Sequence, residues 1–154
     1  MADAVYEDPR EAILARLLEL ARSIDDSFEA RRNETGLPDT SKYVVLFDGE
    51  EHAVGDIPGR RNAAEPPPQI VEMTPEVQFR LAAKAKDVGT ALNALRIRLI
   101  AAVLTDPVLL ALTVKGTSMR FAGSNTATER GRSMEGGIGV AFTFAYLLRP
   151  AREV

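Results

Sequence analysis

The sequence predicts an α+β domain in which two helices pack on one face of a mixed or antiparallel sheet of four to five strands. Residues 9–24 and 88–104 carry apolar side chains at the 3.6-residue period of amphipathic helices. Residues 69–82 and 138–148 alternate apolar and polar side chains, as half-buried strands do. Because the predicted order leaves room for only one crossover connection, we expect mainly antiparallel pairing.

The first helix is expected to start where Asp8 precedes Pro9, since aspartate caps free N–H groups and proline fits the first helical position. Residues 27–33 fit a short strand, and the apolar run at 43–47 fits a strand covered on both faces. Residues 48–68 contain three glycines, four prolines and no periodicity. We therefore expect a long irregular loop there.

The strand at 69–82 carries Pro75 on its apolar side. Because proline cannot donate to a ladder, we expect a sheet edge or a bulge at that point. Asp87 is expected to cap the second helix, and the VLLAL segment after Asp106 is expected to add a short turn. Residues 117–124 fit a further strand, followed by a polar loop.

The final strand at 138–148 has one face of large apolar side chains. Its other face is small enough for another backbone to lie against it, because it consists of Gly139, Ala141, Thr143 and Ala145.

Composition indicates one globular domain over residues 1–154, with 45% hydrophobic and 27% charged residues. No apolar stretch approaches the ~20 residues needed to cross a bilayer, and the N-terminal residues lack the apolar core of a secretory signal. The chain has no cysteine, which excludes disulfides, thiolate metal sites and cysteine nucleophiles. No membrane partner is expected.

The net charge of −3 is unevenly distributed along the chain. Residues 1–60 carry 7 basic and 14 acidic side chains, a balance of −7, whereas residues 61–154 carry 12 and 8, a balance of +4. Chance segregation is one explanation. The other is a molecule with an acidic and a basic flank that docks head to tail with its own copies.

His52 is the only histidine, and it lies among the acidic residues of the predicted loop. Two-residue spacing on an extended chain could aim Asp48, Glu50 and His52 the same way, as a metal site would need. A solvated acidic loop is the preferred interpretation, because the segment offers no ordered partners for such ligands. No G-x-S-x-G elbow occurs, and the glycine-dense GGIG precedes a strand, not a helix. We expect no catalytic residue, no cofactor and no metal.

Basic side chains on the second helix and in the polar loop could face phosphates, but the pI of about 5.3 argues against tight DNA binding. The second helix also carries a second apolar stripe, nearly opposite its core side, formed by Ile97, Ile100 and Leu104.

Taken together, these segments resemble the tail terminator proteins of long-tailed bacteriophages and prophages. The resemblance extends over about residues 11–150 and is strongest at the LPD and VVLFDGEE strand exit, at PQIVEMTPE, and at RSMEG running into a strand closed by LRP. It implies a small α+β subunit of a six-membered ring that caps the tail tube, halts its polymerisation and meets the head connector. DNA passes through the central hole, and the family supplies no catalytic residues.

On this interpretation the protein lies at the head-proximal end of the virion tail, and in the host cytoplasm during assembly. The expected subunit interface contains Arg96, Ile97, Arg98, Ile100, Leu104, Arg130 and Arg132. The loop expected to contact a neighbouring subunit or the tube protein contains Asp48, Glu50, Glu51, Asp56, Arg60 and Arg61. Two alternatives are another neck protein, such as a connector stopper or completion protein, and a small metal-dependent enzyme that uses residues 48–56.

Overall fold

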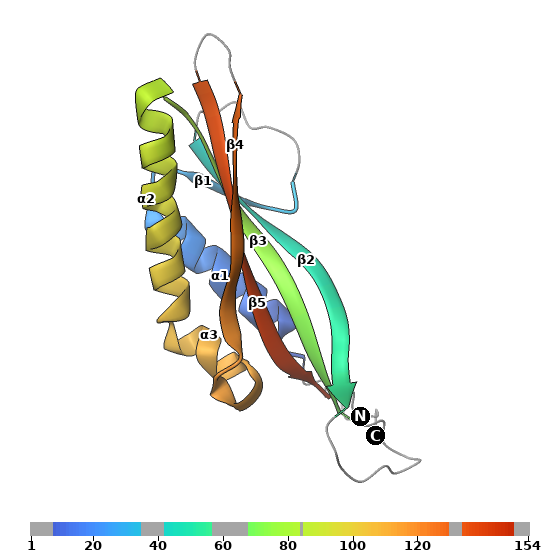
Figure 1. Cartoon of the computed structure of the whole chain (residues 1–154). Helices are drawn as coiled ribbons and strands as arrows, with labels where there is room; N and C mark the ends of the chain where they lie inside the picture. The colour runs from blue at the N-terminus through green and yellow to red at the C-terminus, as the bar shows by residue number, and fades with distance from the viewer. Residues whose placement is uncertain (1–7, 35–41, 57–67, 84, 130–133, 150–154) are drawn as a thin grey trace.

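A five-stranded mixed sheet forms the centre of the protein, and helices α1 (Arg10–Ile24) and α2 (Ala85–Leu104) both lie on one face of it (Figure 1). This arrangement confirms the predicted α+β class. The computed structural model describes residues 8–34, 42–56, 68–83, 85–129 and 134–149.

The strands are β1 (Glu29–Arg32), β2 (Lys42–Asp56), β3 (Gln69–Ala83), β4 (Met119–Glu129) and β5 (Met134–Leu148). They lie in the order β1-β2-β3-β5-β4, so that β3 and β5 are flanked on both sides. Only β1 and β2 run parallel, and β1 pairs with residues 43–46 of β2 alone. The other three pairings are antiparallel. A short helix α3 (Pro107–Leu112) and a 3-10 turn (Val114–Gly116) connect α2 to β4.

The core lies between the helices and the facing side of the sheet. Alternate residues of β3 and β5 point toward the helices, as their period of two predicts. Phe28, just before β1, packs edge-to-face on Phe79 of β3 with ring centroids 5.9 Å apart. The fully buried large side chains are Ile13, Leu14, Leu17, Leu46, Met73, Phe79, Leu92, Leu99, Leu109, Phe142, Phe144 and Tyr146.

Both predicted helix caps are displaced. Pro9 occupies the N-cap position of α1. Asp8 lies one residue before the cap, and its carboxylate accepts a hydrogen bond from the Arg10 N–H at 3.1 Å. Helix α2 begins at Ala85, so that Asp87 lies within its first turn instead of capping it. An acidic side chain in that turn still favours the helix, because the N-terminal end of a helix carries partial positive charge.

Two predicted loops are partly strand. Residues 48–56 belong to β2, residues 125–129 belong to β4, and residues 134–137 belong to β5. These segments are polar or glycine-rich. They therefore lack the alternation of apolar and polar residues by which a strand is predicted from sequence. Residues 57–67 and 130–133 of these predicted loops lie outside the described residues.

A bulge interrupts the pairing of β2 with β3. Phe47 pairs with Glu76 but Glu50 pairs with Thr74, so β2 contains one extra residue there. Gly49 has φ +75°, and a Cβ at this position would overlap the Thr74 carbonyl group. Pro75 lies on β3 between the two partners and has no N–H to donate. The sequence predicted an edge or a bulge at Pro75, and the bulge is confirmed; β3 itself is an inner strand.

Asp106 connects α1 to the junction between α2 and α3. Arg16 of α1 donates two hydrogen bonds to its carboxylate, at 2.7 and 3.0 Å, and the same carboxylate caps α3 by accepting the Leu109 N–H at 2.9 Å. The Asp106 side chain is buried. The guanidinium of Arg16 holds the pKa of Asp106 below its ordinary value.

We predict that Asp106→Asn lowers the free energy of unfolding at pH 7 by about 1–3 kcal/mol, since the amide can still cap α3 but cannot pair with Arg16. Because the pKa of Asp106 is lower in the folded protein than in the unfolded chain, the ionised carboxylate stabilises the fold above the ordinary aspartate pKa. This stabilisation is lost as the pH falls through the folded-state pKa. Denaturant titrations between about pH 2 and 7 should therefore show a weaker acid dependence in Asp106→Asn than in wild type. Asp26→Asn, at an exposed residue, is the control. An equal acid dependence in wild type and Asp106→Asn would contradict the assignment.

We also predict that Gly49→Ala destabilises the protein by about 2–4 kcal/mol, because it combines a positive φ with a steric overlap on β3. Gly89→Ala is the matched control: Gly89 lies in α2, and a Cβ there would meet nothing within 4 Å. That change should stabilise the protein by about 0.5–1 kcal/mol. Denaturant unfolding of both variants measures the difference, and equal effects would show that the bulge does not require glycine.

Candidate functional site

The bulge at Gly49 determines which side chains of β2 reach the face of the sheet opposite the helices, called here the open face. Val44 and Leu46 point into the core. Without the extra residue, Glu50 and His52 would continue that alternation and point toward the helices. With it, Glu50 and His52 lie opposite Thr74 and Glu72 on the open face.

Glu51 points the other way and forms part of the framework. It accepts a hydrogen bond from the buried Tyr146 hydroxyl, and the guanidinium of Arg10 lies 3.1 Å from its carboxylate. Burial, together with the neighbouring Glu51 carboxylate, raises the pKa of Tyr146 above its ordinary value. Glu51 was predicted to contact a partner, but the structure places it in a contact that joins α1, β2 and β5.

Asp48 is also bound within the protein. Arg32 of β1 donates to its carboxylate at 2.9 and 3.0 Å and to Glu11 of α1 at 2.6 and 3.0 Å. The hydrogen bond from Arg32 lowers the pKa of Asp48. The common alignment of Asp48, Glu50 and His52 therefore does not occur, because the bulge separates Asp48 from the other two. The described residues contain no group of three His, Asp or Glu side chains that could hold a metal ion.

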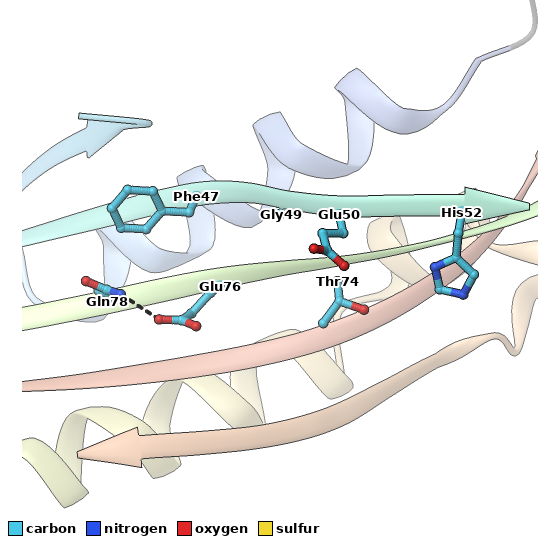
Figure 2. A pocket seen from close by; sticks show the side chains of 7 residues that line it. All are labelled: Phe47, Gly49, Glu50, His52, Thr74, Glu76 and Gln78. Atoms are coloured by element: carbon cyan, nitrogen blue, oxygen red, sulfur yellow. Dashed lines mark hydrogen bonds between the residues drawn. The ribbon is translucent and has the colours of Figure 1, made fainter. Parts of the chain in front are cut away.

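The open face has a shallow hollow of about 410 Å³ beside the bulge. Part of its lining is polar: the Gln78 amide donates to Glu76 at 2.6 Å, and the Thr74 hydroxyl lies 3.1 Å from that of Thr143. Figure 2 shows the side chains of Glu50 and His52, which project from β2 and line the hollow. The hollow offers carboxylates, an imidazole and an amide, which suit a cationic or hydrogen-bonding group of a partner. It is lined by Phe47, Gly49, Glu50, His52, Thr74, Glu76 and Gln78.

The small residues of β5 on the open face are partly covered. A Cβ at Gly137 would lie 2.7 Å from Cδ of Arg80, and one at Gly139 would overlap the Glu76 carboxylate. Long side chains of β3 thus lie over these two glycines. The expected approach of another backbone is not available at Gly139, because Glu76 occupies that space.

The outer side of α2 carries exposed apolar side chains. Ile97 is 56% exposed and Leu104 is 39% exposed, and Val108 of α3 adds a third at 49%. Ile100, predicted to belong to the same stripe, instead packs partly against the core. Helix α3 therefore leaves Ile97 and Leu104 uncovered. We call Ile97, Leu104 and Val108 the outer apolar row.

The two arginines predicted beside this row have partners in the protein. The Arg96 Nε donates to the Ser124 hydroxyl at 3.0 Å, and its guanidinium lies 5.4 Å from the ring centroid of Phe121, so it covers the helix side of β4. Arg98 donates to the carbonyl of Ile24 at the end of α1.

The predicted contacts at Arg60, Arg61, Arg130 and Arg132 lie outside the described residues, as does the side chain of Asp56. Sequence reasoning missed the roles of Arg10, Arg16 and Arg32, since their partners are distant in the chain. Besides Pro75, the Asp-Gly pair at 48–49 was an available signal for the bulge.

None of the helices within the described ranges is long and apolar enough to cross a membrane. No protein-family model and no curated protein matches the chain.

Proposed function

We propose that this chain is a structural virion protein that forms a ring on the tail tube of a long-tailed bacteriophage or prophage. The ring ends tube polymerisation and provides the surface that joins the tail to the head. The proposal starts from the resemblance to tail terminators over residues 11–150. The structural observation that best supports it is the outer apolar row, which no described segment covers.

Exposed side chains of this size indicate a contact surface when they lie in a row, although single ones are ordinary. Ile97 and Leu104 are seven residues apart on one helix, so they lie on the same side of α2. Val108, near the start of the following helix α3, is also exposed. Burying three such side chains against a neighbour would supply apolar contacts, while charges set the orientation of the copies.

The uneven charge of the chain favours contacts between unlike surfaces. In the acidic part, Asp48 and Glu51 are paired with Arg32 and Arg10. Glu50 is exposed and forms no ion pair with any described residue. Contacts between unlike surfaces repeat from copy to copy and must either close into a ring or continue as a filament. A terminator requires closure, and the resemblance implies six copies.

The proposed partners follow from that role. One side of the ring would meet the tail tube protein and the other the head connector or stopper, and DNA would pass through the hole without sequence-specific binding. The protein would act in the host cytoplasm during assembly and remain at the head-proximal end of the tail. No cofactor takes part.

The direct test polymerises purified tail tube protein, encoded in the same genome, with and without this chain. We predict that the chain stops elongation and that negative-stain images show it at one end of each tube. Unchanged tube lengths and undecorated ends would contradict the proposal. Attachment to filled heads but not to tubes would instead indicate a different neck protein.

The outer apolar row can be tested in the same experiment. Ile97→Asp with Leu104→Asp should abolish capping at concentrations where wild type caps all tubes, since both added carboxylates would be desolvated at the interface. Because both residues are exposed, the melting temperature should change by only a few degrees. Ala12→Asp with Ala15→Asp adds the same charge to exposed positions of α1 and should cap normally. Normal capping by the first variant would exclude this row from the interface.

A further inference from the structure

The two outer strands of the sheet, β1 and β4, lie at the same level along the strand direction. Following the residue pairings from β1 across the sheet leads from Arg32 to Ser124 and from Ala30 to Thr126. The first row runs through Leu46, Val77 and Val140, and the second runs through Val44, Phe79 and Ile138. If a second copy continued the sheet without any shift along the strands, its residues 29–32 would therefore lie beside residues 124–127 of the first copy.

Strand β4 lacks the usual protection of a sheet edge. Among the described strands it pairs with β5 alone. Edge strands usually avoid unwanted pairing by being short or by carrying charge or proline. Strand β4 spans 11 residues, and its residues 121–128 include neither a charge nor a proline. Its outer side is therefore suited to receive another strand.

The backbone groups of Ser124 and Thr126 point out of the sheet. In an antiparallel pair of strands, hydrogen-bonded residue pairs alternate with pairs that are not hydrogen-bonded. The Ala145 N–H donates to the Ser118 carbonyl at 2.9 Å, so the odd-numbered residues of β5 form the hydrogen-bonded pairs with β4. Ser124 and Thr126 pair with even-numbered residues of β5, so their own N–H and C=O groups face away from β5.

Strand β1 presents matching groups on the opposite edge. The Asn33 N–H, directly after β1, donates to the Leu46 carbonyl of β2 at 2.8 Å. Successive residues of a strand direct their backbone groups to opposite sides, so the odd-numbered residues of β1 face β2. The N–H and C=O groups of Ala30 and Arg32 therefore point outward, at the levels of Thr126 and Ser124.

The strand directions fit as well. Strand β1 runs parallel to β2, and three successive antiparallel pairings separate β2 from β4, so β1 and β4 run in opposite directions. A second copy with its helices on the same side of the sheet would thus present its β1 antiparallel to β4 of the first. Ser124 with Arg32, and Thr126 with Ala30, would then form hydrogen-bonded pairs across the two copies.

The side chains allow this pairing without opposing like charges. Arg31 of β1 forms an ion pair with Glu29, and Arg32 forms ion pairs with Glu11 and Asp48 of its own copy. Residues 121–128 of β4 add no charge opposite them. Pairing of β1 with a second β1 would instead set arginine side chains against each other, which is unfavourable.

We propose that residues 124–127 of β4 in one copy pair antiparallel with residues 29–32 of β1 in the next copy, so that the sheet continues across the subunit interface. The proposal rests on the ring of the proposed function and specifies how its subunits join. Every interface is the same contact between unlike edges, so the contact repeats from copy to copy and can close into a ring.

The absence of cysteine allows a direct test of this register in the full chain. Asn125 of one copy should lie opposite Arg31 of the next as a pair that is not hydrogen-bonded, with Cα atoms about 4.5 Å apart, which is within the range of a disulfide. With copper phenanthroline as the oxidant, Arg31→Cys combined with Asn125→Cys should give a ladder of disulfide-linked oligomers on a non-reducing denaturing gel. Each single variant should remain monomeric on the same gel.

The matched control is Glu29→Cys combined with Asn125→Cys. It places a thiol on the same strand but roughly 8 Å from Asn125, beyond the reach of a disulfide, so it should not cross-link. Equal cross-linking of both pairs, or dimers from Asn125→Cys alone, would overturn the proposal. A ring that forms without these cross-links would overturn the edge pairing and leave the proposed function intact, whereas a protein that stays monomeric would contradict both.

A proline variant tests the same edge without any cross-link. Thr126→Pro removes an N–H that points away from β5, so the monomer should keep its fold while the pairing with β1 of the next copy is lost. The midpoint concentration for assembly, measured by analytical ultracentrifugation, should rise about tenfold or more. Thr126→Ala keeps the N–H and should assemble like wild type. Equal assembly of the two variants would exclude this edge from the interface, and the disulfide test decides if Thr126→Pro loses its thermal unfolding transition.

Discussion

The close approach of Gly49 to the Thr74 carbonyl group determines how the rest of this sheet is used. The bulge reverses the alternation of β2 halfway along the strand, so that a segment rich in acidic residues can follow a buried apolar one in a single strand. Glu51 turns inward to Tyr146 and Arg10, and Glu50 turns outward. A regular strand would present Glu50 and His52 to the helices, where an unpaired charge costs several kcal/mol.

Several ion pairs connect the layers of this fold. Arg32 joins β1 to α1 and β2 through Glu11 and Asp48, and Arg16 joins α1 to the start of α3 through Asp106. These contacts fix the helix layer on one face. Within the described part of the chain, no helix or strand covers the open face, the outer side of β4 or the outer apolar row. A subunit built this way can offer several distinct surfaces at once, which is what a ring between a tube and a connector would require.

The sequence allowed the helices and the inner strands to be predicted because their apolar periods follow directly from burial on one side. Residues 69–82 and 138–148 alternate strictly, and the structure has β3 and β5 there. The outer half of β2 could not be found this way, since charged and glycine residues at an edge carry no such period. Partners such as Arg98 with Ile24 depend on how α2 packs on α1, which no local pattern encodes. Ile97 is exposed whereas Ile100 is partly buried, and this difference depends on the same packing of α2 on α1.

The central claim is that this protein acts by assembling with its own copies through unlike surfaces. Native mass spectrometry of the purified chain, over a wide range of concentrations at near-physiological salt, tests this claim most directly. The account predicts one dominant closed assembly, with six copies expected, whose mass does not grow with concentration. A protein that remains a monomer or a simple dimer throughout that range would contradict it.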